Sequence, residues 1–187
     1  MNHQLDRLLA AYCAPTLAGI KPASLVSCSR SAHPNLPQQL QTYRQAFAAR
    51  GIRFDILCAC PGRFLLLVYH HGQLARCLSD RRVQRVLAQA GYPTGAPLGT
   101  LLDTLRGRMA AQQDFPHEIG LFLGYPVEDV IGFIRHGGRG CKLCGYWKVY
   151  GDAEAASRLF DRLSRVCQAV KRRIEQGETL LEVFAAA

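Results

Sequence analysis

The spacing of hydrophobic residues predicts most of the secondary structure of this 187-residue chain. Apolar residues recur every three or four positions in several segments, which is typical of helices that bury one face. The segments with this helical spacing are 3–12, 36–50, 81–90, 98–109 and 153–176, with shorter helices after Pro15 and Thr179. Apolar and polar residues alternate at 52–60, which predicts a half-buried strand. We expect two more strands, at 25–29 and 63–70. Pro61 and Gly62 suit the centre of a type II turn and predict an antiparallel hairpin.

The segment from His117 to Tyr150 predicts further elements and holds the densest group of reactive residue types. Its apolar run 117–123 predicts a strand, Pro126 begins a helix, and 145–150 predicts another strand. A strand–helix–strand order allows parallel pairing, whereas the hairpin requires antiparallel pairing. We therefore expect an α+β (mixed α/β) fold, in which helices pack on a mixed sheet of about five strands. The chain should form a single domain, 1–187, with the turn-rich stretch 92–97 as the best candidate for an internal boundary.

The last long helix, at 153–176, is predicted to have one buried and one solvated face. We expect its inward face to carry four aliphatic residues, namely Leu159, Leu163, Val166 and Val170. The arginines of this helix lie away from that seam, which is the usual position of a solvated charge run.

Composition indicates a globular protein, because 49% of the residues are apolar and 20% are charged. The longest apolar runs are strand-sized, far short of the roughly 20 residues that span a membrane. The N-terminus lacks the basic flank and apolar block of a signal peptide, so we expect a cytoplasmic protein without a membrane partner. Free thiols are then the ordinary state of its eight cysteines. Strand alternation would place Cys58 and Cys60 on the face of Phe54 and Ile56, as small core residues.

The formal charge of +9 makes an anionic partner plausible, and only four of the 23 basic residues are lysines. Arginine binds phosphate and carboxylate groups with two parallel hydrogen bonds. Arginine-mediated nucleic-acid binding is the weakest of three functional hypotheses, because the arginines are scattered and no basic stripe with interleaved aromatics occurs.

Several residues of 117–150 are candidates for a binding site at the end of the predicted strand. Gly124 would permit close approach of the backbone, and Tyr125 follows it. Strand alternation would place His117 and Glu118 on opposite faces, so they should not act as a pair, although His117 alone is a candidate general base. The commoner role of such a histidine is structural. Two further residues, Tyr146 and Lys148, would share a face toward a cleft or solvent, and Trp147 with Val149 would face the core.

The segment Cys13-Ala-Pro-Thr-Leu-Ala-Gly-Ile-Lys21 supplies a second group of candidates. If it is helical, Cys13, Leu17 and Lys21 lie along one side. A thiol near a helix N-terminus has its thiolate favoured by the helix dipole, which makes Cys13 the best candidate nucleophile. A Cys–His hydrolase or transferase would require the Cys13 thiol within hydrogen-bond reach of His117. Whether the protein is an enzyme stays open.

Cys141-Lys-Leu-Cys144 forms a CxxC motif, which provides an alternative chemistry. The spacing suits half of a zinc or iron–sulfur site, or a dithiol redox pair. A full four-thiolate site would need a second pair, and Cys58 with Cys60 is the only closely spaced choice. A thioredoxin-like motif should open a helix, whereas 145–150 predicts a strand. The alternative function is therefore a cysteine-ligated metal, iron–sulfur or haem redox protein.

Three ordered motifs resemble domain-of-unknown-function family 3793, which occurs mainly in anaerobic bacteria of the clostridial type. They are Cys13 to Lys21, the segment His117 to Pro126 with Asp129 to Ile134, and Cys144 to Tyr150. The resemblance spans essentially the whole chain and implies a small cytosolic bacterial protein. It implies no established activity, cofactor or catalytic residue. From residue chemistry, we expect binding or turnover of a small anionic molecule in a cleft built from 13–21 and 117–150.

Overall fold

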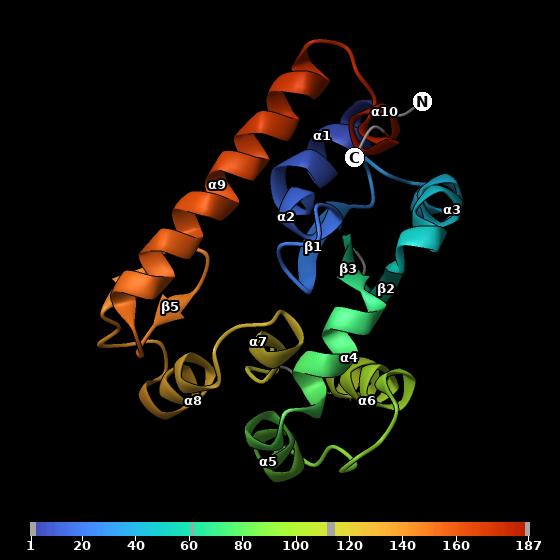
Figure 1. Ribbon diagram of the computed structural model, residues 1–187. Coiled ribbons are helices and arrows are strands. Elements are labelled where there is room, and N and C mark those ends of the chain that lie inside the picture. Colours follow the sequence, from blue (N-terminus) through green and yellow to red (C-terminus); the bar gives the residue numbers. More distant parts are fainter. Residues whose placement is uncertain (1–2, 61, 112–114, 186–187) are drawn as a thin grey trace. The chain divides into compact units, whose positions relative to one another are not determined.

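The chain divides into two compact units. Figure 1 shows its helices and strands. The structure, a computed structural model, describes residues 3–60, 62–111 and 115–185, with only the backbone described for residues 3, 59 and 60. Unit 1 comprises Met1–Gly72 and Leu163–Ala187, and unit 2 comprises Gln73–Arg162. The turn-rich stretch 92–97 therefore lies inside unit 2. Among the described residues, no helix is both long enough and apolar enough to cross a membrane.

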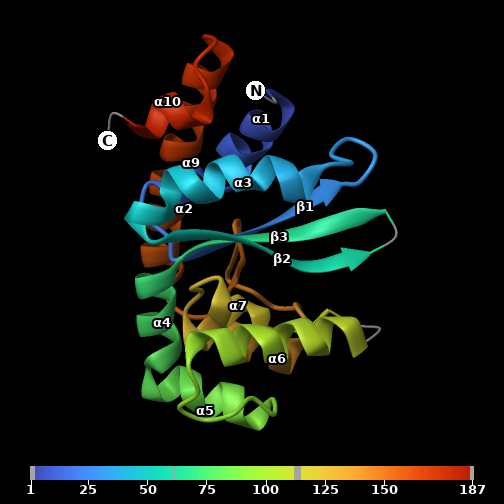
Figure 2. The ribbon, with the colours of Figure 1, turned by 90° about the vertical axis from the view of Figure 1, so that its right-hand side faces the viewer.

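Unit 1 is built on a three-stranded antiparallel sheet with the order β1-β3-β2. Its strands are β1 (Ala23–Ser29), β2 (Ile52–Cys60) and β3 (Arg63–His70). Its helices are α1 (His3–Tyr12), α2 (Ala14–Leu17), α3 (Leu36–Phe47), the 3-10 helix η1 (Ala48–Arg50), α10 (Leu180–Ala185) and the second half of α9 (Ala153–Glu175). Helix α3 lies along the sheet (Figure 2). The predicted hairpin between β2 and β3 is confirmed by their register, although Pro61 lies outside the described residues.

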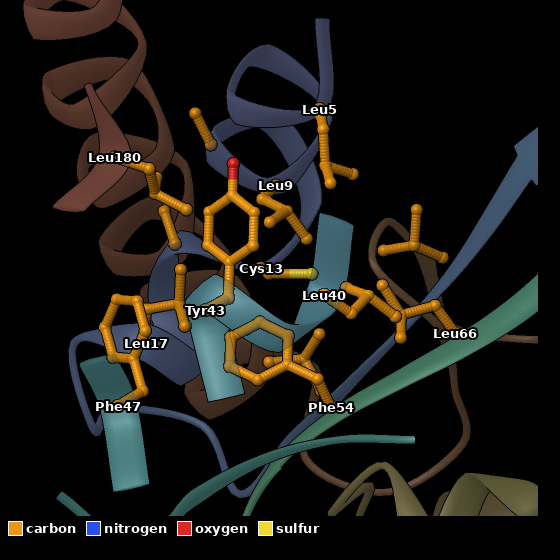
Figure 3. Close-up of a cluster of buried hydrophobic side chains, with 14 of the residues drawn as sticks. Leu5, Leu9, Cys13, Leu17, Leu40, Tyr43, Phe47, Phe54, Leu66 and Leu180 are labelled. Carbon is orange, nitrogen blue, oxygen red and sulfur yellow. The ribbon is translucent and has the colours of Figure 1, made fainter. Parts of the chain in front are cut away.

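One face of this sheet and the helices above it enclose the core of unit 1 (Figure 3). Phe54 and Leu66 from the sheet meet Leu9 of α1, Leu40 of α3 and Phe47 at the end of α3. All five side chains are at most 2% exposed. The helical spacing of the apolar residues in α1 and α3 is thus explained by burial against the sheet.

Unit 2 is mainly helical and carries a small hairpin. Its helices are α4 (His71–Ser79, which begins at the end of unit 1), α5 (Arg81–Gln89), α6 (Leu98–Ala111), α7 (Ile119–Phe122), α8 (Val127–His136) and the first part of α9. The hairpin consists of β4 (Leu143–Cys144) and β5 (Lys148–Val149). Asp80 caps α5, because its carboxylate accepts hydrogen bonds from the backbone nitrogens of Arg82 at 2.8 Å and Val83 at 3.3 Å.

The prediction of one mixed five-stranded sheet is wrong. The described residues form a three-stranded sheet and a separate two-stranded hairpin, and every strand pair among them is antiparallel. The expected strand at 117–123 is instead a single helical turn, α7. Ile119 and all its neighbours up to Leu123 are buried, so a short, wholly apolar run carries no period that separates strand from helix. Of the expected strand at 145–150, only Lys148–Val149 is a strand.

Two predicted side-chain positions, those of Cys58 and Leu159, are also wrong, whereas Leu163 and Val170 of α9 are buried as predicted. A β-bulge between Ile56 and Cys58 changes the register of β2, so that Cys58 pairs with Leu65 rather than continuing the face of Phe54. Cys58 is half-buried, and the side chain of Cys60 lies outside the described residues. In α9 the buried face follows Ala156, Phe160, Leu163, Cys167, Val170 and Ile174. Leu159 is 37% exposed, because Phe160 occupies the inward position.

Candidate functional site

A cavity of about 430 Å³ lies within unit 2, between α7, α8 and the β4–β5 hairpin. It brings together four of the candidates chosen from the sequence, namely His117, Tyr125, Cys144 and Lys148. The remaining lining residues are Phe115, Ile119, Gly120, Leu123, Asp129, Val130, Phe133, Gly145 and Trp147. The cavity is therefore mainly apolar and aromatic, with a small number of polar groups, which is the usual composition of a small-molecule site.

His117 and Glu118 occupy different environments at the start of α7. His117 is exposed and lines the cavity. Its ring and that of Phe133 form a T-shaped pair, with 5.0 Å between ring centroids. Glu118 is 5% exposed and accepts hydrogen bonds from Arg108 Nε at 2.7 Å and the Tyr92 hydroxyl at 3.1 Å. The expectation that the two do not act as a pair therefore holds, but the cause is this buried network rather than strand alternation.

Asp129, in the first turn of α8, holds the hairpin in place. Its Oδ2 accepts a hydrogen bond from Trp147 Nε1 at 2.7 Å, and its Oδ1 accepts from the backbone nitrogens of Tyr150 and Gly151, each at 2.8 Å. Asp129 is 3% exposed, so these three bonds offset the cost of burying its carboxylate. The carboxylate is thus committed to structure, although it belongs to the cavity wall.

Stacked aromatic rings form another wall. Tyr125 and Trp147 stack with 4.7 Å between centroids and 24° between planes, and Phe160 meets Trp147 edge-on at 4.6 Å. As predicted, Trp147 and Val149 are buried. Burial raises the pKa of the Tyr125 hydroxyl above its ordinary value. Gly120 permits this arrangement, because a Cβ there would lie 2.9 Å from Val130 Cγ2 and 3.1 Å from Tyr125 Cδ2.

The lysine and the histidine that line the cavity come from separate elements. Lys148 on β5 donates one hydrogen bond, from Nζ to the Gly138 carbonyl at 2.6 Å, and an ammonium group has three donors. His117 lies two residues before the start of α7. Tyr146 is 40% exposed and its carbonyl accepts a hydrogen bond from the Tyr125 hydroxyl at 3.4 Å, but it does not belong to the described lining. Gly124 has a positive φ of 74° and ends α7 just before Tyr125.

The CxxC thiols lie on the same hairpin. Cys144 is exposed and lines the cavity, whereas Cys141 is half-buried, and both thiols are free. Among the described residues, no group of three or more histidine, cysteine or acidic side chains is arranged to hold a metal ion. The backbone around the motif is fixed by hydrogen bonds from Lys142 N to Val149 O at 2.8 Å and from Gly145 N to Trp147 O at 3.1 Å.

Cys13 and Lys21 belong to unit 1. Helix α2 ends at Leu17, so Lys21 does not continue the predicted helical side. Cys13 is fully buried, and burial raises the pKa of its thiol far above the ordinary value, against the opposing effect of the Lys21 charge. Burial lowers the pKa of Lys21 to about 8, although the Cys13 and Cys167 thiols favour its charged form. This environment disfavours the thiolate that a nucleophile requires.

A family model described as "Protein of unknown function (DUF3793)" matches residues 9–184. The chain belongs to this family. The match covers nearly the whole chain and includes the three motifs quoted from the sequence, of which the first lies in unit 1 and the other two lie in unit 2. Neither the search of curated proteins nor the search of solved structures returned a match.

Sequence reasoning missed several residues that build the cavity of this family member. Phe115, Phe133 and Gly120 line it, and Asp129 fixes the indole of Trp147. Asp129 lies in the first turn of α8, where a carboxylate also complements the helix dipole. The available signal was that Asp129 directly precedes the apolar run 130–134 of the helix. An aspartate on the buried side of a helix needs hydrogen-bond donors nearby.

Proposed function

We propose that unit 2 binds a small anionic molecule with a flat, apolar body in the 430 Å³ cavity. The observation that supports this function is the meeting of His117, Tyr125 and Lys148 in one cavity, although they come from three separate parts of the segment 117–150. The proposal uses only residues of unit 2. A contribution of Cys13 and Lys21 to the same site stays a prediction, as does catalysis by a Cys13–His117 pair.

The charge of the ligand follows from the polar groups that line the cavity. Lys148 carries a positive charge and His117 can donate a hydrogen bond. The one carboxylate of the described lining, Asp129, already accepts three hydrogen bonds. An anion would therefore meet donors rather than an uncompensated negative charge.

The shape of the ligand follows from the aromatic wall. The Tyr125–Trp147 stack and Phe133 present flat apolar surface, which favours a planar ring by stacking. Asp129 holds the indole of Trp147 in one orientation, so the wall is formed before a ligand arrives. A preformed wall reduces the ordering cost of binding.

Isothermal titration calorimetry with naphthalene-2-carboxylate and its neutral analogue naphthalene-2-carboxamide tests the proposal. We expect the carboxylate to bind and the amide to bind about tenfold more weakly, because one charge-assisted contact is lost. Lys148→Met should weaken carboxylate binding to the level of the amide and leave amide binding unchanged. His117→Asn should weaken carboxylate binding by a smaller factor.

Matched controls are available in unit 1. His71 and Lys171 are both exposed, so His71→Asn and Lys171→Met remove the same groups without touching the cavity. These controls should bind like the unmodified protein. Equal binding of acid and amide, or equal losses in the control and cavity variants, would refute the proposal.

The alternative function is a cysteine-ligated metal, iron–sulfur or haem redox protein that uses Cys141 and Cys144. One observation favours it: Cys144 is exposed and Cys141 is half-buried, so solvent reaches the motif. Elemental analysis and an absorption spectrum of protein purified without oxygen test it. A bound metal lost in Cys144→Ser but kept in Cys77→Ser would support this function, and a colourless, metal-free, folded protein would count against it.

A further inference from the structure

A second cavity of unit 2, of about 660 Å³, lies among α4, α5, the connector 92–97 and the start of α6. Its floor is aliphatic, since Leu78, Leu98 and Leu101 line it and are at most 8% exposed. Alanines and a proline extend this surface, namely Ala75, Ala88, Ala96 and Pro97. No aromatic side chain is among its described lining residues. The lining therefore differs chemically from the aromatic cavity of the proposed function.

The walls of this aliphatic cavity are held together by one side chain. Gln84 of α5 donates a hydrogen bond from Nε2 to the Leu78 carbonyl at 2.6 Å, and its Oε1 accepts one from the Gly95 backbone nitrogen at 2.9 Å. Gln84 thus ties the end of α4 and the connector to α5. The positive φ of 70° at Gly95 suits glycine and allows the connector to turn toward Gln84.

The rim of the cavity is cationic. Arg81 and Arg85 line it, are exposed, and are four residues apart on α5, so both guanidinium groups lie on the same side of the helix. None of the described lining residues is acidic. The nearest carboxylate in sequence, Asp80, caps α5 through the backbone nitrogens of Arg82 and Val83. The aliphatic floor and the arginine pair are complementary to an amphipathic anion.

We propose that this aliphatic cavity binds the acyl chain of a fatty acid, with the carboxylate at Arg81 and Arg85. A flexible alkyl chain suits a floor of leucine and alanine side chains, since apolar burial needs no ring geometry. Arginine suits the carboxylate, because its planar fork binds both oxygens. This proposal stands independently of the function assigned to the aromatic cavity.

A homologous series provides the first test. Calorimetric titration of the full chain with hexanoate, octanoate and decanoate, each below its micelle concentration, should show tighter binding with each added methylene. The expected gain is about two- to fourfold per methylene, since the cavity buries only part of each group. Octanamide should bind about tenfold more weakly than octanoate, because the exposed ion pairs each contribute modestly.

Two sets of variants locate the binding. Arg81→Met with Arg85→Met should weaken octanoate binding to the level of octanamide. Arg82→Met is the matched control on the same helix, because Arg82 is exposed and pairs with Glu128 at 2.5 Å rather than lining this cavity. Circular dichroism should be measured for each variant to check that it is folded.

The outcomes separate this inference from the proposed function. Loss of octanoate binding in the Arg81/Arg85 variant, with naphthalene-2-carboxylate binding retained, supports a distinct fatty-acid site. An affinity that does not rise with chain length overturns the inference. So does octanoate binding that survives Arg81→Met/Arg85→Met but is lost in Lys148→Met, because the aromatic cavity would then be its site.

Discussion

The two units place their candidate cysteines in opposite environments. In unit 1, Cys13 is fully buried in the core and Lys21 is partly buried, and burial shifts the pKa of each group against its charged form. In unit 2, Cys144 is exposed and, together with Lys148, lines a cavity. The comparison shows that a cysteine near a lysine in the sequence is a candidate for a reactive site only when the fold leaves its thiol open to solvent.

Thiol reactivity should show the largest difference between the units. A short pulse of iodoacetamide at neutral pH, followed by peptide mass spectrometry, should modify Cys144 about a thousandfold faster than Cys13. The reason is that a core thiol reacts only after an opening that costs several kcal/mol, and only as a thiolate. In denaturant, both cysteines should react at similar rates. Equal rates in the folded protein would break the comparison.

Removal of an aromatic ring should be more costly in the core of unit 1 than in the cavity wall of unit 2. Phe54→Ala should lower the free energy of unfolding by about 3–5 kcal/mol, because Phe54 is fully buried among Leu and Phe side chains. Phe133→Ala removes a half-buried ring beside the cavity and should lower it by about 1–2 kcal/mol. Urea unfolding followed by circular dichroism measures both. Similar losses would indicate that the cavity wall is packed like the core.

Close packing behind the hairpin can be tested with two helical glycines. A Cβ at Gly132 of α8 would lie 2.4 Å from Tyr150 Cγ, so Gly132→Ala should destabilise unit 2 by about 1–3 kcal/mol. Gly107 of α6 has nothing within 4 Å of such a Cβ. Gly107→Ala should therefore stabilise the protein by about 0.5–1 kcal/mol through helix propensity. Thermal unfolding measures the two shifts, and the same sign for both would contradict the packing argument.

Burial of Lys21 should also make the stability of the protein depend on pH. Its folded-state pKa of about 8 lies below the unfolded value of about 10.4, so the unfolded state binds more protons between these values. The burial penalty is therefore complete below about pH 8 and is relieved as pH rises toward 10. Lys21→Met should be more stable than the unmodified protein by about 1–2 kcal/mol at pH 7. That difference should shrink above pH 8.

Exposed Lys171 provides the control for this pH dependence. Lys171→Met should show no such change in urea midpoints measured from pH 7 to 9.5. A constant advantage of Lys21→Met over this range would mean that Lys21 remains charged in the folded core.

The sequence predicted those elements whose hydrophobic period runs long enough to be unambiguous. Helices α6 and α9 and the β2–β3 hairpin have this property and are confirmed. Helix α7 is too short and too uniformly apolar to show a period, so it resembled a strand. The bulge before Cys58 depends on contacts between β2 and β3, and no local pattern reveals it.

The sequence predicted several residues of the candidate site, but it did not predict which other residues would form the walls of the cavity. His117, Tyr125 and Lys148 were chosen from the sequence because polar and aromatic side chains gather in one segment, and the fold brings them to one cavity. Phe133 lies in the apolar run of α8, and its local pattern does not distinguish a cavity-lining ring from a core ring. The role of Asp129 depends on donors more than 15 positions away in the chain, which a local pattern cannot show.

The position of Trp147 in the cavity wall has a practical consequence for spectroscopy. Trp147 is the sole tryptophan of the 187-residue chain, and its indole forms part of the cavity wall beside Tyr125. Fluorescence excited at the red edge of the protein absorption spectrum therefore comes from Trp147 alone, in the wall of the 430 Å³ cavity. Its wavelength and intensity report the polarity and occupancy of that cavity, without any label introduced into the protein.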